Sequence, residues 1–294
     1  MKRYRDIAGD GGSNIVGQVA EQQARLRERL AAVRRIVAVV SGKGGVGKSS
    51  ITANLAAALA ADGHAVGVLD ADLNGPSIAK MLGVRGQPLH VTDAGVEPAR
   101  SAQGVRVLSM DLLLASDDTP VVWAAPTQAD AHTWRGTMEA NALREFLTDT
   151  AWGALDVLLL DLPPGADRLP TVADLLPGLT GAVVVTIPSE VSHLVVTRSI
   201  ALARDAGVPL LGLVENMAGY TCLQCGAVGT LFSGPGGART AAALSIPFLG
   251  AVPFDPRLAE AADRGRPFVL DHPESPSGRA LGELAAGLAA ALSR

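Results

Sequence analysis

The stretch "SGKGGVGKSS" (residues 41–50) decides the fold of this chain. It fits the pattern G-x-x-x-x-G-K-[ST], with Gly42, Gly47, Lys48 and Ser49 at the four fixed positions. An apolar segment precedes it and an Ala-rich segment follows it, which predicts a strand, a loop and a helix. Glycines let backbone N–H groups converge on phosphate oxygens, and a helix N-terminus adds a positive dipole end. The stretch therefore predicts a phosphate-binding loop for a nucleotide.

Two lysines of this loop stand out because the chain has only four, at positions 2, 43, 48 and 80. Lys48 is expected to reach the β- and γ-phosphates of the nucleotide, and Ser49 is expected to ligate Mg²⁺. The residues predicted to contact the nucleotide here are Gly42, Lys43, Gly44, Gly45, Val46, Gly47, Lys48, Ser49 and Ser50.

Outward from the loop, short apolar segments alternate with Ala- and Leu-rich helical stretches. The apolar segments, each typical of a buried strand, are residues 35–42, 65–72, 105–110, 156–163, 181–188, 209–216 and 247–253. This alternation predicts an α/β fold, a mostly parallel twisted sheet with helices on both faces. In such folds ligands bind beyond the carboxyl ends of the strands.

The chain is predicted to form one domain, residues 34–294, preceded by an N-terminal arm, residues 1–33. Residues 1–16 are polar and Gly-rich, which favours flexibility, and residues 17–34 have helical periodicity. The stretch at 277–293 predicts a final helix with its leucines on one stripe, packed against the sheet. The predicted domain includes a candidate metal loop at residues 216–230.

Charge and hydropathy limit the classes of partner that the sequence predicts. The net charge is −4, so no overall positive field attracts nucleic acid or anionic lipid. The apolar runs are too short to cross a bilayer, and the N-terminus lacks the apolar core of a signal peptide. We therefore expect a cytoplasmic protein without a nucleic-acid or membrane partner.

Three aspartates stand at or near the ends of predicted strands and are candidate Mg²⁺ or catalytic groups. Asp70 and Asp72 lie in "VLDADLNGPS" (residues 68–77), and Asp161 ends the apolar run of "LLLDLPPG" (residues 158–165). A carboxylate at the position of Asp161 can hold Mg²⁺ through water. Asp70 and Asp72 share a side if the strand persists, although an aspartate in this position is also common as a turn or cap residue.

The loop sequence K-G-G-x-G-K-S resembles the deviant Walker A loop of the MinD, ParA and nitrogenase-iron-protein class. The resemblance implies an ATP-dependent homodimer in which Lys43 of one copy reaches the nucleotide of the other. It further implies that Asp72 orients the attacking water, that Asp70 lies near the Mg²⁺ shell and that the Gly165 backbone senses the γ-phosphate. Lys43, Lys48 and Asp72 are thus the candidate catalytic residues.

The whole set of motifs resembles the Mrp/Nbp-type P-loop ATPases, the iron–sulfur cluster carrier family. The matching stretches run in the family's order over roughly residues 36–270: "SGKGGVGKSS", "DADLNGPS", "WRGTM", "LDVLLLDLPPG", "ENMAGYTCLQCG" and "VPFDPRLAEAADRGRP". By this resemblance Asn216 reads the adenine edge, and Pro253 and Asp255 lie beside the base. The family usually has Thr-Gly-Asp after "PPG", whereas this chain has residues 166–168 as "ADR".

Cys222 and Cys225 are the only cysteines in the chain, and they stand in a C-x₂-C pattern. The pattern is typical of half a four-thiolate zinc or [4Fe–4S] site, or of a redox dithiol. No H-x₃-H pair is present to complete a zinc site within one chain. Two copies of the chain would supply four thiolates, and the resemblance favours [4Fe–4S] over zinc because spacing alone does not choose the metal.

These inferences predict a homodimeric ATPase that holds a [4Fe–4S] cluster at its interface and passes it to apo-proteins, with ATP and Mg²⁺ as cofactors. The alternative is a ParA- or MinD-like ATPase switch with a structural zinc at the cysteines. A P-loop kinase or synthetase would need an acceptor pocket, for which the sequence offers no candidate.

Overall fold

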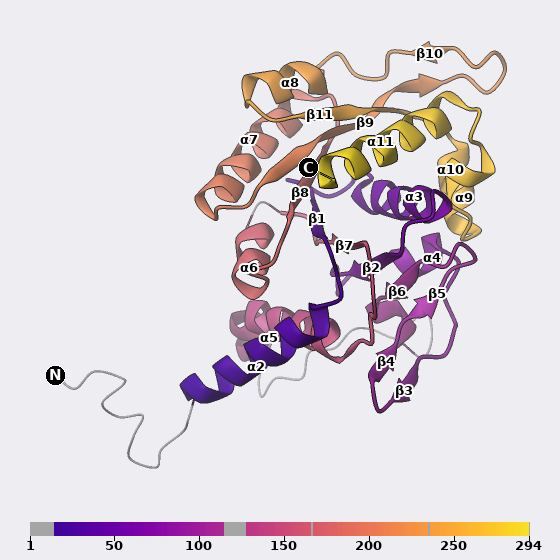
Figure 1. Ribbon diagram of the computed structural model, residues 1–294. Helices are drawn as coiled ribbons and strands as arrows, with labels where there is room; N and C mark the ends of the chain where they lie inside the picture. Colours follow the sequence, from indigo (N-terminus) through magenta and orange to yellow (C-terminus); the bar gives the residue numbers. More distant parts are fainter. Residues whose placement is uncertain (1–14, 115–127, 166, 235, 294) are drawn as a thin grey trace.

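A mostly parallel β-sheet divides the molecule into two layers of helices (Figure 1). The computed structural model describes residues 15–114, 128–165, 167–234 and 236–293. The strands are β1 (Ile36–Val40), β2 (Val66–Asp70), β3 (His90–Thr92), β4 (Gly95–Glu97), β5 (Ala99–Arg100), β6 (Arg106–Leu108), β7 (Val157–Asp161), β8 (Gly181–Thr186), β9 (Leu210–Thr221), β10 (Val228–Gly229) and β11 (Phe248–Phe254). The helices are α2 (Ile15–Leu30), α3 (Lys48–Ala61), α4 (Ile78–Met81), η1 (Met110–Leu112), α5 (Gln128–Asp149), α6 (Arg168–Leu175), α7 (Glu190–Asp205), α8 (Gly237–Ala243), α9 (Arg257–Asp263), α10 (Phe268–Asp271) and α11 (Pro276–Leu292).

The order of the strands in the main sheet is β10-β9-β8-β1-β7-β2-β6-β5, and β11 also pairs with β9. Only β5 and β10 run antiparallel to their neighbours among the described strands of this sheet. All seven predicted strands are present, so the predicted α/β class is confirmed. The short strands β3, β4, β5 and β10 were not predicted, because two or three residues carry no readable period.

Both faces of the sheet are covered by apolar side chains. On one face α3 and α11 pack, and the leucine stripe predicted for α11 is buried at Leu281, Leu284 and Leu288. On the other face lie α5, α6 and α7, with side chains of β1 and β7 between them. The strands at the centre are buried on both sides, which is why they read as continuous apolar runs rather than as alternating patterns.

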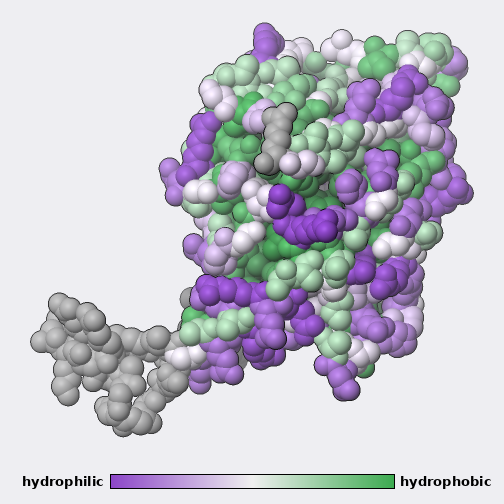
Figure 2. All heavy atoms as spheres, in the orientation of Figure 1, coloured by the Kyte–Doolittle hydropathy of each residue, from purple (hydrophilic) through white to green (hydrophobic). Residues whose placement is uncertain are grey.

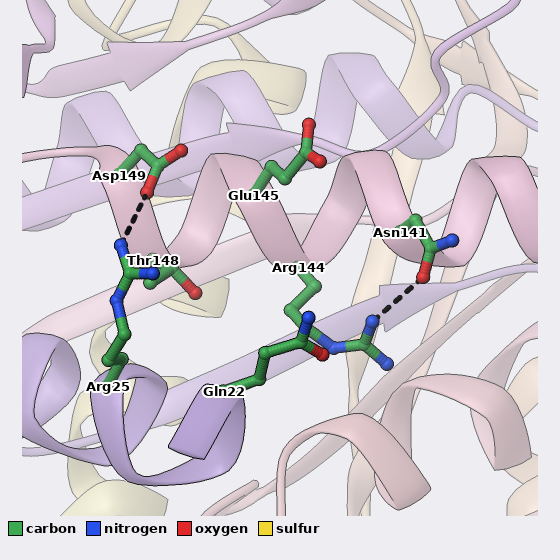
Figure 3. A pocket seen from close by; sticks show the side chains of 7 residues that line it. All are labelled: Gln22, Arg25, Asn141, Arg144, Glu145, Thr148 and Asp149. Carbon is green, nitrogen blue, oxygen red and sulfur yellow. Dashed lines mark hydrogen bonds and ion pairs between the residues drawn. The ribbon is translucent and has the colours of Figure 1, made fainter. Parts of the chain in front are cut away.

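The helix α2 packs on α5 through Leu26 and Leu30, which are both buried. Nε of Arg29 donates a hydrogen bond to the Thr148 carbonyl at 2.7 Å. A polar cavity of about 340 Å³ lies between the two helices, with Gln22 and Arg25 on α2 facing the side chains of α5 (Figure 3). None of its lining residues belongs to the phosphate loop. Of the residues 1–16 that were predicted to be flexible, positions 1–14 lie outside the described residues, and positions 15 and 16 already belong to α2.

The strand β9 is irregular in its second half. Its register with β11 shifts between Val252 and Phe254, and Met217 has a φ of 54°, a left-handed conformation that side chains other than glycine rarely adopt. An extra residue in one strand of a pair bends that strand and increases its twist. This irregularity lies between Asn216 and the cysteines.

Among the described residues, no helix is both long enough and apolar enough to span a membrane.

Candidate functional site

Three neighbouring parallel strands bring the predicted site together at their carboxyl ends. The phosphate loop follows β1, Asp70 ends β2 and Asp161 ends β7. In the sheet register Asp161 lies opposite Val39 of β1 on one side and opposite Asp70 of β2 on the other. The two aspartates are therefore direct cross-strand neighbours, as the rule for open α/β sheets predicts.

Glycines give the phosphate loop its shape at two positions. Gly45 and Gly47 have φ angles of 76° and 77°, in the left-handed region that glycine adopts without strain. A Cβ atom on Gly47 would lie 2.2 Å from Nδ2 of Asn216, so the site has no space for a side chain there. The helix α3 begins at the next residue, Lys48, and directs its N-terminal N–H groups toward the loop.

Asp161 is the centre of the cluster and is fully buried. Its Oδ2 atom forms an ion pair with Nζ of Lys48 at 2.7 Å and accepts a hydrogen bond from Oγ of Ser49 at 2.6 Å. Its Oδ1 atom accepts a hydrogen bond from Oγ1 of Thr52 at 2.7 Å. Sequence reasoning missed Thr52, although its position four residues after Lys48 on a helix places both on one face.

Asp70 is also fully buried and accepts hydrogen bonds from the loop that follows its own strand. Its Oδ2 atom accepts from the backbone N–H groups of Ser77 at 2.8 Å and Ile78 at 3.0 Å, and from Oγ of Ser109 at 3.1 Å. Burial, reinforced by the negative charge of Asp161, raises the pKa of Asp70 to about 7. Asp70 thus holds the β2–α4 loop (residues 71–77), and Ser109 is a further partner that the sequence did not reveal.

Asp72 and Lys43 lie at the margin of this cluster. Oδ1 of Asp72 accepts a hydrogen bond from the backbone N–H of Gly75 at 3.2 Å, which closes a turn in the β2–α4 loop. Lys43 is half-buried, and its side chain makes no hydrogen bond or ion pair with any described residue. Its ammonium group is therefore available to a ligand or to another chain.

The β7–α6 loop, described at residues 162–165 and 167, runs beside the phosphate loop. The N–H of Gly165 donates a hydrogen bond to the Ser41 carbonyl at 3.0 Å. The ring of Pro164 lies 3.8 Å from the position that a Cβ atom on Gly44 would take. The backbone predicted to sense the γ-phosphate is thus adjacent to the loop predicted to bind it.

Asn216 is buried and links β9 to the phosphate loop, because its Nδ2 atom donates a hydrogen bond to the Val46 carbonyl at 2.9 Å. This contact was not anticipated from the sequence. Its amide oxygen makes no hydrogen bond with any described residue and can still accept from a ligand.

Asp255 and Pro253 lie at the end of β11. Burial opposes ionisation of Asp255, but hydrogen bonds from Arg257 hold the pKa of its carboxyl below the usual value. The Arg257 guanidinium contacts both carboxylate oxygens, at 3.0 and 2.7 Å. The Pro253 carbonyl accepts a hydrogen bond from Oγ of Ser277 at 2.9 Å. Both residues are therefore held rigidly from the side of α9 and α11.

Cys222 and Cys225 lie in the turn between β9 and β10. The turn is closed by two backbone hydrogen bonds, from Cys222 N–H to the Ala227 carbonyl at 2.9 Å and from Gly226 N–H to the Cys222 carbonyl at 2.8 Å. Cys222 is half-buried and Cys225 is exposed. Backbone N–H groups of Cys225 and Gln224 lower the pKa of the Cys222 thiol, which favours the thiolate form that binds metals.

No group of three or more His, Cys, Asp or Glu residues suitable for a metal ion occurs among the described residues. The two sulfur atoms therefore do not meet a third ligand of the same described chain. Exposed apolar side chains surround the turn, namely Leu223, Val228, Leu231 and Phe232. In the orientation of Figure 1, Figure 2 shows apolar surface at the corner where β10 lies.

Replacing Glu215 with glutamine is expected to stabilise the protein more at about pH 8 than at about pH 5. Glu215 precedes Asn216 on β9, is buried, and accepts a hydrogen bond from the Gly237 N–H at 2.6 Å. Burial raises the pKa of its carboxyl. The folded chain thus holds this proton more tightly than the unfolded chain, and the wild type loses stability as pH rises from the usual carboxyl pKa to the raised one.

Thermal unfolding of the wild type and of Glu215→Gln across this pH range measures the effect. We expect the Tm of the variant relative to that of the wild type to be a few degrees higher at about pH 8 than at about pH 5. Glu145→Gln on α5 is the matched control, because Glu145 is exposed. Identical pH profiles for the wild type and Glu215→Gln would contradict the prediction.

Comparison with known proteins gives a consistent result. The family model described as "ParA: NUBPL iron-transfer P-loop NTPase" matches residues 32–289. The chain is 45% identical over 263 residues to an iron-sulfur cluster carrier protein of Saccharolobus solfataricus, covering 89% of this chain and 85% of that protein. It is 43% identical over 262 residues to the cytosolic Fe-S cluster assembly factor NUBP2 of Bos taurus, covering 87% of this chain and 92% of that protein.

Solved structures agree with the sequence matches. A nucleotide-binding protein of Archaeoglobus fulgidus in complex with ADP superposes with a TM-score of 0.70 at 37% identity, covering 83% of this chain and 91% of that chain. The MinD cell division protein of Aquifex aeolicus superposes with a TM-score of 0.59 at 23% identity, covering 87% of this chain and 97% of that chain. The likeness to MinD supports the fold alone. The likeness to the Archaeoglobus fulgidus protein is one of sequence as well as of fold.

Proposed function

Because the chain belongs to the NUBPL-type iron-transfer P-loop NTPases, the iron–sulfur cluster carrier family, we propose that it carries a [4Fe–4S] cluster between the two subunits of an ATP-hydrolysing homodimer. In this proposal apo iron–sulfur proteins receive the cluster, and the transfer takes place in the cytoplasm. The observation that carries the proposal is the position of the cysteines. They lie at the end of β9, the strand that contacts the phosphate loop through Asn216.

The nucleotide part of the proposal rests on Lys48, Ser49 and Asp161. The hydroxyl of Ser49 and the carboxylate of Asp161 lie 2.6 Å apart and are oxygen ligands of the kind that Mg²⁺ prefers. They therefore fit a magnesium ion, which supplies charge neutralisation at the phosphates when it is bound. When the nucleotide binds, Lys48 leaves its ion pair with Asp161 and contacts the β- and γ-phosphates instead. Asp70, whose Oδ2 already accepts three hydrogen bonds, supports this site by holding the β2–α4 loop.

Hydrolysis is assigned to three groups around the γ-phosphate. Asp72 orients the attacking water, the backbone of Gly165 contacts the γ-phosphate, and Lys43 of one subunit reaches the nucleotide of the other. A second cation near the γ-phosphate stabilises the charge that develops in the transition state. The unpaired side chain of Lys43 supports its role in the partner's site, since nothing in the described chain competes for it.

The adenine side is assigned to Asn216, Pro253 and Asp255. The amide oxygen of Asn216 is available to accept from the adenine amino group, while its Nδ2 atom holds the Val46 carbonyl. Through this side chain, adenine bound to the amide oxygen is linked to both β9, which carries Asn216, and the phosphate loop, which the Nδ2 atom contacts.

A second copy of the chain completes the metal site. Cluster ligation by cysteine usually takes four thiolates, and each chain has two cysteines. Two chains related by a two-fold axis bring four together, and the exposed apolar side chains around the turn supply the surface that such a contact buries.

Anaerobic reconstitution with ferrous iron and sulfide tests the proposal. We expect four iron and four sulfide per two chains, a visible charge-transfer absorption band, and a dimer in solution. ATP turnover by the same preparation is expected to require Mg²⁺. One zinc per dimer in freshly purified protein, without the visible band and without iron uptake, would contradict the carrier function and favour a zinc-containing ATPase switch.

A further inference from the structure

Glu139 on α5 joins the two loops that flank the nucleotide site. Its Oε1 atom accepts a hydrogen bond from Nδ2 of Asn74 at 2.8 Å. Its Oε2 atom forms an ion pair with Nη1 of Arg168 at 2.9 Å. Asn74 belongs to the β2–α4 loop, and Arg168 is the first residue of α6, where the β7–α6 loop ends. One carboxylate thus holds both loops through different oxygen atoms.

Glu139 is mostly buried, so its carboxylate depends on these contacts. Its side chain is only 11% exposed, whereas that of Arg168 is 36% exposed. A carboxylate with so little water around it is costly unless charged or polar partners satisfy it. Asn74 and Arg168 come from segments that are far apart in the sequence, and losing either contact leaves the carboxylate less satisfied, which ties the positions of the two loops together.

The bridged residues are close in sequence to the groups that act on the γ-phosphate. Asn74 is two residues from Asp72, and Arg168 is three residues from Gly165. Asp72 lies in the loop that follows β2, and Gly165 lies in the loop that follows β7. The distance between the water-orienting carboxylate and the γ-phosphate-sensing backbone therefore depends on both loops at once.

We propose that Glu139 is a positioning residue for ATP hydrolysis, which fixes the β2–α4 and β7–α6 loops relative to each other. This inference rests on the proposed ATPase function. The contacts described for Glu139 are with Asn74 and Arg168, and neither of these is among the residues assigned to the nucleotide. Its effect is on the geometry of the reacting groups, so it changes kcat rather than the affinity for ATP.

The test is a double-mutant cycle with Glu139→Ala, Arg168→Ala and the double variant, measured on the full chain without cluster. We expect each single variant to lower kcat about tenfold, because misplacing the two loops costs alignment of the reacting groups, with KM for ATP changed less than about twofold. The double variant is expected to be no slower than Glu139→Ala, because both changes break the same ion pair. Additive losses in kcat would overturn the proposal.

Two further variants separate positioning from simple loss of folding. Glu139→Gln keeps an oxygen acceptor for Asn74 and for Arg168 while removing the charge of the pair, and is expected to recover most of the kcat that Glu139→Ala loses. Glu145→Ala is the matched control, because Glu145 lies on the same helix, belongs to the lining of the cavity in Figure 3 and makes no hydrogen bond or ion pair with the described residues of either loop. Recovery in thermal stability without recovery in kcat would show that the bridge is only structural.

Failure of this inference is distinguishable from failure of the proposed function. If the wild type binds a fluorescent ATP analogue but hydrolyses no ATP, the ATPase function fails. If the wild type hydrolyses ATP and Glu139→Ala has the same kcat, only the role of Glu139 fails.

Discussion

Replacing Cys222 with serine should abolish cluster binding. Anaerobic reconstitution of Cys222→Ser is expected to give iron and sulfide near zero per dimer and no visible absorption band, against four of each for the wild type. The reason is that each chain has two thiols, and the loss of one removes two of the four ligands of a shared site at once. Cys225→Ser is expected to behave in the same way, because both cysteines lie in one turn between β9 and β10.

Gln224→Ala is the control for this experiment. Gln224 lies between the two cysteines and contributes its backbone N–H to the Cys222 thiolate, a contact that the substitution keeps. We therefore expect this variant to bind iron and sulfide like the wild type. Equal iron content in Cys222→Ser and the wild type would place the cluster elsewhere and remove the basis of the carrier proposal.

Replacing Lys48 with alanine should reduce ATP affinity by about a hundredfold or more, because a charge-assisted contact with two phosphates is lost. The same change leaves the buried carboxylate of Asp161 without its ion pair. Removing one partner of a buried pair typically costs about 3–5 kcal/mol of folding stability. Binding of a fluorescent ATP analogue and thermal unfolding with and without nucleotide measure the two effects separately.

Lys80→Ala is the matched control, since Lys80 is an exposed lysine on α4 in a chain with four lysines. It is expected to leave both ATP binding and Tm close to those of the wild type. If Lys48→Ala binds ATP as tightly as Lys80→Ala, residues 41–50 are not the phosphate-binding loop of this protein.

The sequence predicts the α/β class and the order of its buried strands because a parallel sheet covered on both faces needs continuous apolar runs. It likewise places the phosphate loop, Asp70 and Asp161 together, because parallel strands end at the same edge of the sheet. These inferences need only the local pattern of residues and one topological rule.

The contacts that join distant segments could not be predicted from the sequence. Asn216 is 170 residues away from the Val46 carbonyl that it contacts, and Ser109 lies 39 residues from Asp70. Glu139 belongs to a helix that was not predicted, because its turns mix apolar, charged and small residues without a clear stripe. No local period encodes which polar side chain completes a site, since that choice depends on how the layers pack.

The length of β9 sets an upper limit on the separation of the two proposed sites. Asn216 and Cys222 are six residues apart on one chain segment, which spans at most about 20 Å at 3.3 Å per residue. The strand between them, irregular at Met217, is the covalent connection through which a change at one proposed site would reach the other.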